Sequence, residues 1–175
     1  AFDSTEVVSN TYEMYQQVGS YGAGTYDFLG GFGLGDQGAS ISGDGSIFAV
    51  GVERDDDAGT DLGSVIVFGK DANGKWVENQ KLFASDAGDD GGNDRFGRVV
   101  AVSKDGNYMI VGQRYHDDGD VANNANAGAA WIFRKNPDSL VWEEKHKFLG
   151  PIAGDEFGVS VSISHDGTFV AISSL

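Results

Sequence analysis

The feature that most constrains this chain is a hairpin-like unit that occurs three times at equal spacing. Residues 94–112 read as an apolar strand, a turn at Asp105-Gly106 and a second apolar strand. The same pattern surrounds Asp44-Gly45 and Asp166-Gly167. Asp44 precedes Asp105 by the same number of residues as Asp105 precedes Asp166. Asp-Gly between two apolar runs favours a hairpin, because glycine accepts the positive φ of a tight turn. Equal spacing of a whole hairpin predicts a repeat architecture.

Two more strands are expected to follow each hairpin. The third strand, Gly63–Lys70 or Gly128–Lys135, comes after an acidic loop, and the fourth begins at an aromatic residue, Trp76 or Trp142, with Tyr12 in the matching place near the start of the chain. Four antiparallel strands per repeat predict an all-β fold built from β-propeller blades. A parallel β-helix fits less well, because it lacks tight hairpins.

The chain, residues 1–175, is therefore expected to be a single β-propeller or a propeller fragment. The four strands of a repeat are called A, B, C and D in chain order. The predicted parts are strands C and D of one blade in 1–19, a blade in 32–83, a blade in 96–149, and strands A and B of a further blade in 157–174. This is about three blades' worth, whereas closed propellers have about four to eight blades. We expect the chain to be part of a larger propeller, or to close a ring with missing blades or with another copy.

Hydrophobic patterning also predicts which strands are buried. Strands A and B are the most apolar and are expected to be the most buried, while the polar D strands are expected at the outer edge. The residues expected in the core are Val100, Val102, Ile110, Val111, Val161, Ile163, Val170 and Ile172.

Composition excludes several classes of partner. The formal net charge is −15 and the sequence contains no cysteine. Nucleic acids and anionic membrane surfaces attract basic patches, so neither is an expected partner. The longest purely apolar runs, such as Ala129–Phe133, are far too short to span a bilayer, so no membrane insertion is expected.

The Phe-Gly pairs at the start of each repeat resemble a known family. Phe96-Gly97 is followed by a strand ending in Val111-Gly112, and related segments begin at Phe32-Gly33 and Phe157-Gly158. This pattern resembles the FG-GAP repeat of integrin-α-type β-propellers, as does the strand Gly63–Phe68. The resemblance implies an extracellular or cell-surface location and a role in adhesion. The calcium loop that the family often carries between strands A and B is replaced by a Ser-x-Asp-Gly turn, which is too short to wrap a cation.

A different loop contains candidate calcium ligands. Asp86, Asp90 and Asp94 partly match the spacing of calcium loops, and calcium prefers six to eight oxygen ligands. The alternative is a solvated turn, in which aspartate only favours the turn geometry. Similar but weaker candidates are Asp55, Asp57 and Asp61 in one loop, and Asp118, Asp120 and Asn123 in another.

The remaining residues show no catalytic constellation. The arginines are few and scattered along the chain, and His116 in its acidic loop is expected at the surface. The tryptophans could stack on sugars, but their recurrence in the repeat favours packing. The sequence thus predicts a non-enzymatic extracellular module that binds a protein or glycan partner through acidic loops. The alternatives are a structural subunit of a large assembly or filament, and a glycan-active enzyme domain.

Overall fold

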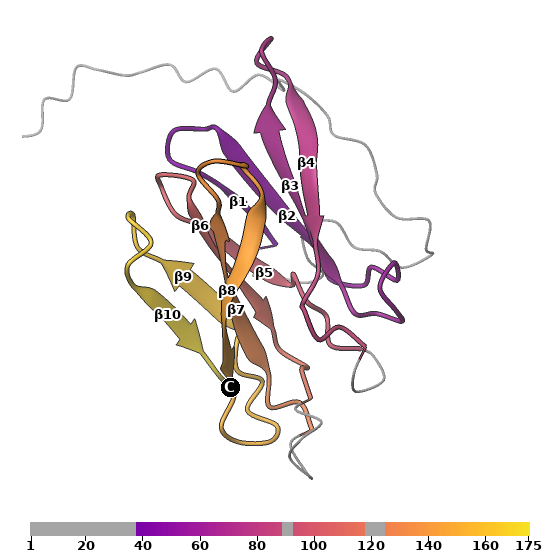
Figure 1. Cartoon of the computed structure of the whole chain (residues 1–175). Coiled ribbons are helices and arrows are strands. Elements are labelled where there is room, and N and C mark those ends of the chain that lie inside the picture. Colours follow the sequence, from indigo (N-terminus) through magenta and orange to yellow (C-terminus); the bar gives the residue numbers. More distant parts are fainter. Residues whose placement is uncertain (1–37, 89–92, 118–124) are drawn as a thin grey trace, which may run out of the picture.

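The computed structural model describes residues 38–88, 93–117 and 125–175, and all regular secondary structure in these ranges is β-strand. Figure 1 shows three antiparallel sheets lying side by side in chain order. The predicted strands within 1–19 and the Phe32-Gly33 pair lie outside the described residues. No helix that is long and apolar enough to cross a bilayer occurs within the described ranges.

The strands have the following bounds. The first sheet contains β1 (Ala39–Ile41), β2 (Ile47–Val52), β3 (Ser64–Lys70) and β4 (Trp76–Leu82). The second contains β5 (Val99–Val102), β6 (Tyr108–Gln113), β7 (Ala129–Lys135) and β8 (Trp142–Leu149). The third is the hairpin of β9 (Ser160–Ile163) and β10 (Val170–Ser173). The prediction of four-stranded antiparallel propeller blades is confirmed, and the described sheets do not close into a ring.

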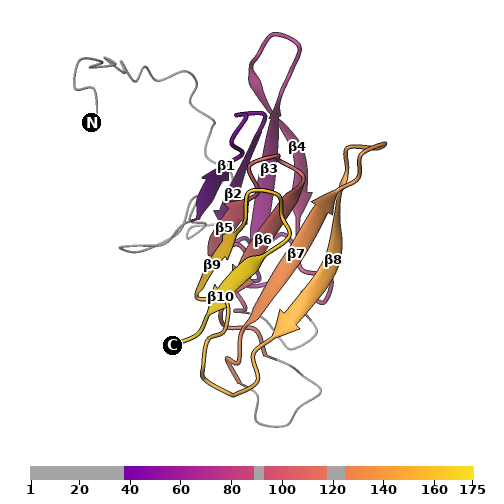
Figure 2. The same cartoon turned by 90° about the vertical axis from the view of Figure 1, so that its left-hand side faces the viewer.

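The up-and-down order of the strands gives each blade two different ends. Short turns join the first strand to the second and the third to the fourth at one end, called here the turn end (Figure 2). The described parts of the connections 53–63, 83–98, 114–128 and 150–159 lie at the opposite end, called here the loop end. Because the described blades repeat this alternation, these connections gather at the same end.

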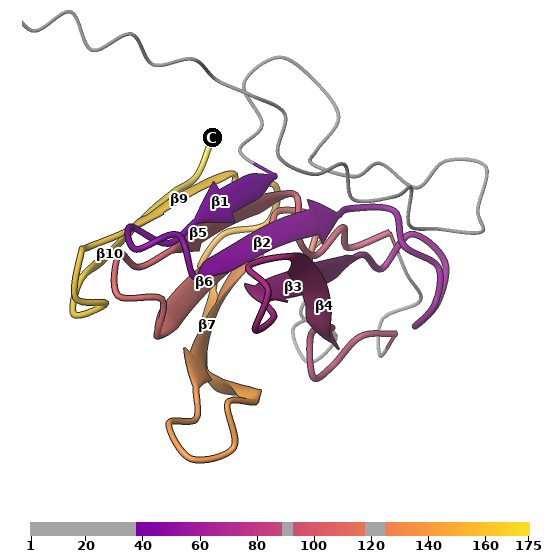
Figure 3. The ribbon, with the colours of Figure 1, turned by 90° about the horizontal axis from the view of Figure 1, so that it is seen from above.

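The first strands of the sheets, β1, β5 and β9, gather at one side, and the sheets fan outward from them (Figure 3). The core fills the spaces between the sheets. One cluster lies between the first and second blades and includes Ala49, Val67, Val111 and Trp131. Another lies between the second and third blades, around Val99, Ile110, Ala130 and Val161. The blades are thus held together face to face by apolar packing.

Burial along the strands corrects one prediction. The polar outer strands β4 and β8 are mostly half-buried or exposed, as expected, but β3 and β7 are as buried as β2 and β6. A third strand has a neighbour on each side within its sheet and a sheet packed against its face. β1 is the least buried strand of its sheet, because it is short and lies at the edge.

The core residues predicted in the second blade are confirmed, since Val100, Val102, Ile110 and Val111 are all buried. In the third blade only Val161 is buried, whereas Ile163, Val170 and Ile172 are half-buried. These half-buried residues pack against the second blade. The β9–β10 hairpin has a sheet against one face only within the described residues, which explains their partial exposure.

The Ser-x-Asp-Gly turns hold themselves together by the same contacts in each repeat. In the first, the Ser42 hydroxyl donates to Asp44 at 2.6 Å, while the Ile47 amide donates to the Ser42 hydroxyl at 3.0 Å. The corresponding pairs are Ser103–Asp105 at 2.5 Å and Ser164–Asp166 at 2.8 Å. The aspartate oxygens therefore accept hydrogen bonds within the turn itself.

These turns also link consecutive blades through the backbone. The Gly43 amide donates to the Lys104 carbonyl of the next blade at 2.9 Å, and the Lys104 amide donates to the His165 carbonyl of the third blade at 3.0 Å. All three residues hold the second position of their Ser-x-Asp-Gly turn. The repeat thus builds a ladder of hydrogen bonds that crosses the blade boundaries at the turn end.

The turn aspartates predict a pH dependence of stability. Hydrogen bonds from Ser42 and Ser46 lower the pKa of Asp44 to about 2. An aspartate in an unfolded chain has a pKa of about 3.9, so the stabilisation is present above that pH and is lost as the pH falls toward 2. We expect urea unfolding between about pH 5 and 2.5 to show a steeper loss of stability for the wild type than for Asp44→Asn. Parallel curves would show that this turn contributes nothing.

Candidate functional site

The loop end is assembled by contacts between each Phe-Gly pair and the preceding blade. The Phe96 amide donates to the Leu62 carbonyl at 2.8 Å, and in the next repeat the Phe157 amide donates to the Ala127 carbonyl at 2.8 Å. The glycine that follows each acceptor, Gly63 or Gly128, has a φ near +80° and lies directly against the phenylalanine backbone. A side chain there would collide with that backbone, so glycine is required for the close approach.

A Glu–Arg ion pair crosses each of the two described blade boundaries. Glu53, which is fully buried, pairs with Arg98 at 3.3 Å between the first and second blades. Arg114 pairs with Glu156 at 3.4 Å between the second and third blades. Glu53 and Arg114 occupy the same position in consecutive repeats. The preceding blade therefore supplies the negative partner at the first boundary and the positive partner at the second.

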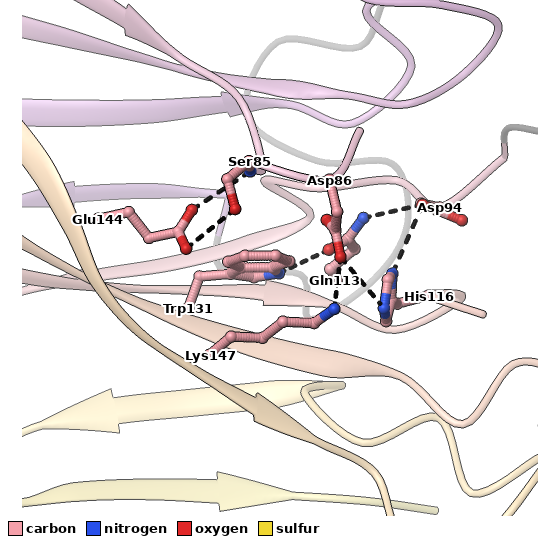
Figure 4. Close-up of polar contacts among 8 residues, drawn as sticks. All are labelled: Ser85, Asp86, Asp94, Gln113, His116, Trp131, Glu144 and Lys147. Carbon is pink, nitrogen blue, oxygen red and sulfur yellow. Dashed lines mark hydrogen bonds and ion pairs between the residues drawn. The ribbon is translucent and has the colours of Figure 1, made fainter. Parts of the chain in front are cut away.

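The most deeply buried polar cluster of the loop end surrounds His116, whose side chain is only 4% exposed (Figure 4). Its Nδ1 lies 3.6 Å from Asp94 Oδ2 and its Nε2 lies 3.7 Å from Asp86 Oδ2. Gln113 donates to Asp94 at 3.1 Å and accepts from the Trp131 indole N–H at 2.5 Å. Carboxylates from both ends of the 83–98 connection therefore face the same imidazole ring.

Lys147 adds a positive charge on the outer side of this cluster. Its ammonium group pairs with Asp86 and lies 4.9 Å from the centre of the Trp131 ring (Figure 4). Nearby, the backbone N–H and the hydroxyl of Ser85 both donate to Glu144, at 3.2 and 3.1 Å. The connection that leaves the first blade is thus bound to β8 of the second blade before it reaches Asp94.

The predicted calcium ligands are placed as follows. Asp86 and Asp94 lie on opposite sides of the His116 ring, and Asp90 lies outside the described residues (Figure 4). Asp94 is buried, whereas Asp86 is partly exposed and is bonded to Lys147. One oxygen of Asp86, Oδ1, is buried without a hydrogen-bond partner. The described groups offer oxygen ligands, but a histidine and a lysine already lie beside them.

The other acidic loops differ from one another. Asp55 is buried and bonded to the Ser64 hydroxyl at 2.8 Å, and it shares the Lys81 ammonium with the exposed Asp57. Asp61 has a positive φ of 51° and accepts the Arg95 amide through its carbonyl at 3.2 Å. Asp55 and Asp57 thus meet at Lys81, whereas Asp61 contacts Arg95 through its backbone carbonyl. Asp118, Asp120 and Asn123 lie outside the described residues.

The expectation that His116 lies at the surface is wrong, since the residue is only 3% exposed. The repeat offers a parallel that becomes visible only once the structure shows the burial of Asp55. His116 stands one repeat after Asp55, and Asp55 is also buried, at 2% exposure. Lys81 from the fourth strand of the first blade pairs with Asp55, whereas Lys147 from that of the second blade pairs with Asp86, which lies beside His116. The two blades thus carry a buried polar residue at the same repeat position.

The arginines are scattered in the sequence but gather in the structure, which sequence reasoning missed. Arg54 and Arg98 lie close enough to Arg95 to oppose its charge. The guanidinium groups of Arg95 and Arg114 lie 4.9 and 4.1 Å from the centre of the Tyr115 ring. These four arginines come from 53–63, 83–98 and the start of 114–128, so the topology brings them to the same end.

The tryptophans pack as predicted rather than standing free for sugar stacking. Trp131 is fully buried and Trp142 is 3% exposed, and both belong to the cluster between the first two blades. Trp76 is half-buried against the outer face of the first blade. Trp142 is also fixed to β4, because Gln80 bonds its amide at 2.8 Å and its carbonyl at 3.0 Å.

These sheets define a protein built from β-propeller blades, with its longer connections at one end. Residues 76–133 match the model of the FG-GAP repeat family, so the chain carries an FG-GAP repeat, as the sequence predicted. The matched stretch runs from β4 to Phe133 in β7 and contains the Phe96-Gly97 pair.

Among solved structures, one similar chain is the crystal structure of a "putative 6-phosphogluconolactonase" from Bacteroides uniformis. The sequences are 18% identical and the TM-score is 0.46, over 79% of this chain and 32% of that chain. This chain thus spans about a third of that protein's length, and the likeness is too low to bear on function. A comparison with curated proteins gave no match.

Proposed function

We propose that this chain is a non-enzymatic, extracellular binding or adhesion module of the FG-GAP propeller type, which presents its loop end to a protein or glycan partner. The observation that carries the proposal is the collection of the long connections at one end of the sheets (Figure 2). Rigid strands hold these loops, and loops on a rigid scaffold are common binding elements. The exposed Asp56 and Asp57 on 53–63 supply acidic groups that a partner can reach.

The polar chemistry of the loop end supports binding rather than catalysis. His116 is buried among Asp86, Asp94 and Trp131, so its ring is closed off from a substrate in solution. A general base has to come within hydrogen-bond reach of the proton that it removes. The location outside the cell is proposed from the resemblance of the repeats to integrin-α-type propellers.

The experiment compares acidic residues at the two ends of the blades. Candidate partners are extracellular proteins and an array of glycans, screened by surface plasmon resonance with the purified chain. We expect Asp56→Asn/Asp57→Asn to weaken binding of the identified partner at least tenfold. The matched turn-end variant Asp71→Asn/Asp138→Asn, which also removes two acids, is expected to leave binding unchanged.

Two outcomes would contradict the proposal. If the Asp71→Asn/Asp138→Asn variant loses binding and the Asp56→Asn/Asp57→Asn variant keeps it, the partner binds at the turn end and not at the loop end. A chain that binds nothing but polymerises with rising concentration in sedimentation would favour the structural-subunit alternative. That alternative draws support from β10, an edge strand within the described residues beside the 77% exposed Phe169, because edge strands are templates for pairing.

We also propose that the 83–98 connection binds Ca²⁺ through Asp86, Asp90 and Asp94. The unpartnered Oδ1 of Asp86 supports the proposal, because a buried carboxylate oxygen without a hydrogen bond is unfavourable. Calcium would supply positive charge among these carboxylates and order the approach to β5. Lys147 on Asp86 already supplies one positive charge, so the ion competes with this lysine.

Thermal unfolding tests the calcium proposal. Millimolar Ca²⁺ is expected to raise the melting temperature of the wild type, and Mg²⁺ is expected to raise it less, because Mg²⁺ demands stricter octahedral geometry. Asp90→Asn should remove most of the calcium effect, whereas Asp138→Asn at the turn end should keep it. Equal responses to both ions would indicate general screening of the acidic surface. An unchanged calcium effect in Asp90→Asn would also overturn the proposal.

A further inference from the structure

We infer that Arg95, flanked by Arg54 and Tyr115, forms a recognition site for a carboxylate group of a ligand at the loop end. The inference deepens the proposed function by naming the ligand chemistry, and it rests on the loop end being the binding face. It concerns a cationic site within a chain of formal net charge −15. The site is built on arginines, whereas the candidate residues that the sequence singled out are acidic.

Arg95 differs from the arginines beside it in its charge partners. Arg98 pairs with Glu53 at 3.3 Å and Arg114 pairs with Glu156 at 3.4 Å. Arg95 has no carboxylate within ion-pair distance in the described part of the chain. Its guanidinium group instead lies 4.9 Å from the centre of the Tyr115 ring, and its Nε is buried without a hydrogen-bond partner.

The surroundings of Arg95 make its positive charge costly. The guanidinium group is half-buried, and the positive charges of Arg54 and Arg98 lie close to it alongside the negative charges of Glu53 and Asp61. A guanidinium group remains charged in proteins, so the cost cannot be relieved by losing the proton. A bound anion would relieve it by supplying the missing opposite charge.

The position of the Arg95 backbone is fixed by the blade boundary. Arg95 has a positive φ of 58°, and its amide donates to the Asp61 carbonyl of the preceding blade at 3.2 Å. Glu156, at the same position of the next repeat, has a φ of 50°, and its backbone amide donates to the Asn126 carbonyl at 3.1 Å. The left-handed conformation is therefore a feature of this position in both repeats. Because the backbone is held by the blade boundary, the side chain is presented from a preorganised position.

The chemistry of the site favours a singly charged carboxylate. The planar guanidinium fork matches the two oxygens of a carboxylate in a bidentate pair. Glu53, Asp61 and Glu156 lie around the arginine cluster, and the whole chain is strongly negative. A dianion or a polyanion would meet more repulsion from these groups than a monoanion would.

An acetate titration followed by nuclear magnetic resonance tests the site without a partner protein. Sodium acetate and sodium chloride are compared at equal ionic strength, with the Arg95 Nε–H and Tyr115 ring signals as readouts. We expect saturable shifts with acetate only, and at least a tenfold weaker response of Tyr115 in Arg95→Gln. Arg95→Lys, which keeps the charge and loses the fork, is expected to weaken the response as well.

Arg134→Gln is the matched control, because Arg134 also lies over a tyrosine ring, Tyr108, at 5.6 Å, but belongs to β7 and lies away from the cluster. It is expected to leave the acetate response intact. Equal shifts with acetate and chloride, an unchanged Tyr115 response in a folded Arg95→Gln, or tighter binding of sulfate than of acetate would each overturn the inference. Failure here leaves the loop-end proposal standing, since that proposal is tested by the aspartate variants and a partner.

Discussion

Replacement of Gly51 or Gly112 by alanine is expected to destabilise the protein by about 3 kcal/mol or more, the upper part of the range for overpacked cores. The two glycines hold the same position in consecutive repeats, each in the second strand of its blade. A Cβ at Gly51 would lie 1.6 Å from the Gly97 carbonyl oxygen, and one at Gly112 would lie 2.2 Å from the Gly158 carbonyl oxygen. The obstacle is backbone in both cases, so the blades have to separate to admit the methyl group.

Urea unfolding of Gly51→Ala and Gly112→Ala measures this loss, with Gly74→Ala as the control. Gly74 has a positive φ of 77°, but an added Cβ there meets nothing within 4 Å. The control variant therefore suffers only the backbone strain of a left-handed residue, about 1 kcal/mol. If all three variants lose the same stability, the close approach of the blades is not what these glycines provide.

Trp131→Ala is the second substitution with a large expected effect, about 3–5 kcal/mol for a fully buried tryptophan. The side chain is fully buried between the first two blades and lies edge-on to Phe96 at 6.2 Å. Its indole N–H also donates to Gln113 at 2.5 Å. Truncation removes the packing and leaves the buried Gln113 oxygen without this donor.

Two further variants separate the packing of Trp131 from its hydrogen bond. Trp131→Phe keeps most of the volume and loses the donor, so it is expected to cost about 1–3 kcal/mol, the penalty of a buried unsatisfied acceptor. Trp76→Ala removes a half-buried tryptophan and should cost less than Trp131→Ala. An effect of Trp131→Ala no greater than that of Trp76→Ala in urea unfolding would contradict the central place of Trp131 in the core.

The four-stranded blades could be predicted from the sequence because the pattern that indicates them is local and is repeated along the chain. Asp105-Gly106 and its two copies mark a hairpin within a few residues, and the alternation around Val100 and Ile110 identifies the buried faces. The partial burial of Val170 was not foreseeable in the same way. It depends on whether a sheet lies against the second face of its hairpin, which no local pattern records.

The candidate site was less accessible to sequence reasoning because its contacts cross the blade boundaries. Arg98 pairs with Glu53 across one boundary, and Arg114 pairs with Glu156 across the next, although each pair is more than 40 residues apart along the chain. The repeat period relates equivalent positions in two blades, but it does not say which groups face each other between blades. The burial of His116 shows the same limit, since the repeat relates this residue to Asp55 but only the structure shows that Asp55 is buried.

The central claim of this account is that the repeats are propeller blades joined backbone to backbone at their turns. Amide hydrogen exchange tests it most directly at Gly43 and Lys104, which are exposed turn residues whose amides donate to the next blade. We expect both amides to exchange as slowly as those of the neighbouring strands. The His165 amide, at the same turn position but without an acceptor among the described residues, should exchange fast. Fast exchange at all three positions would contradict the claim.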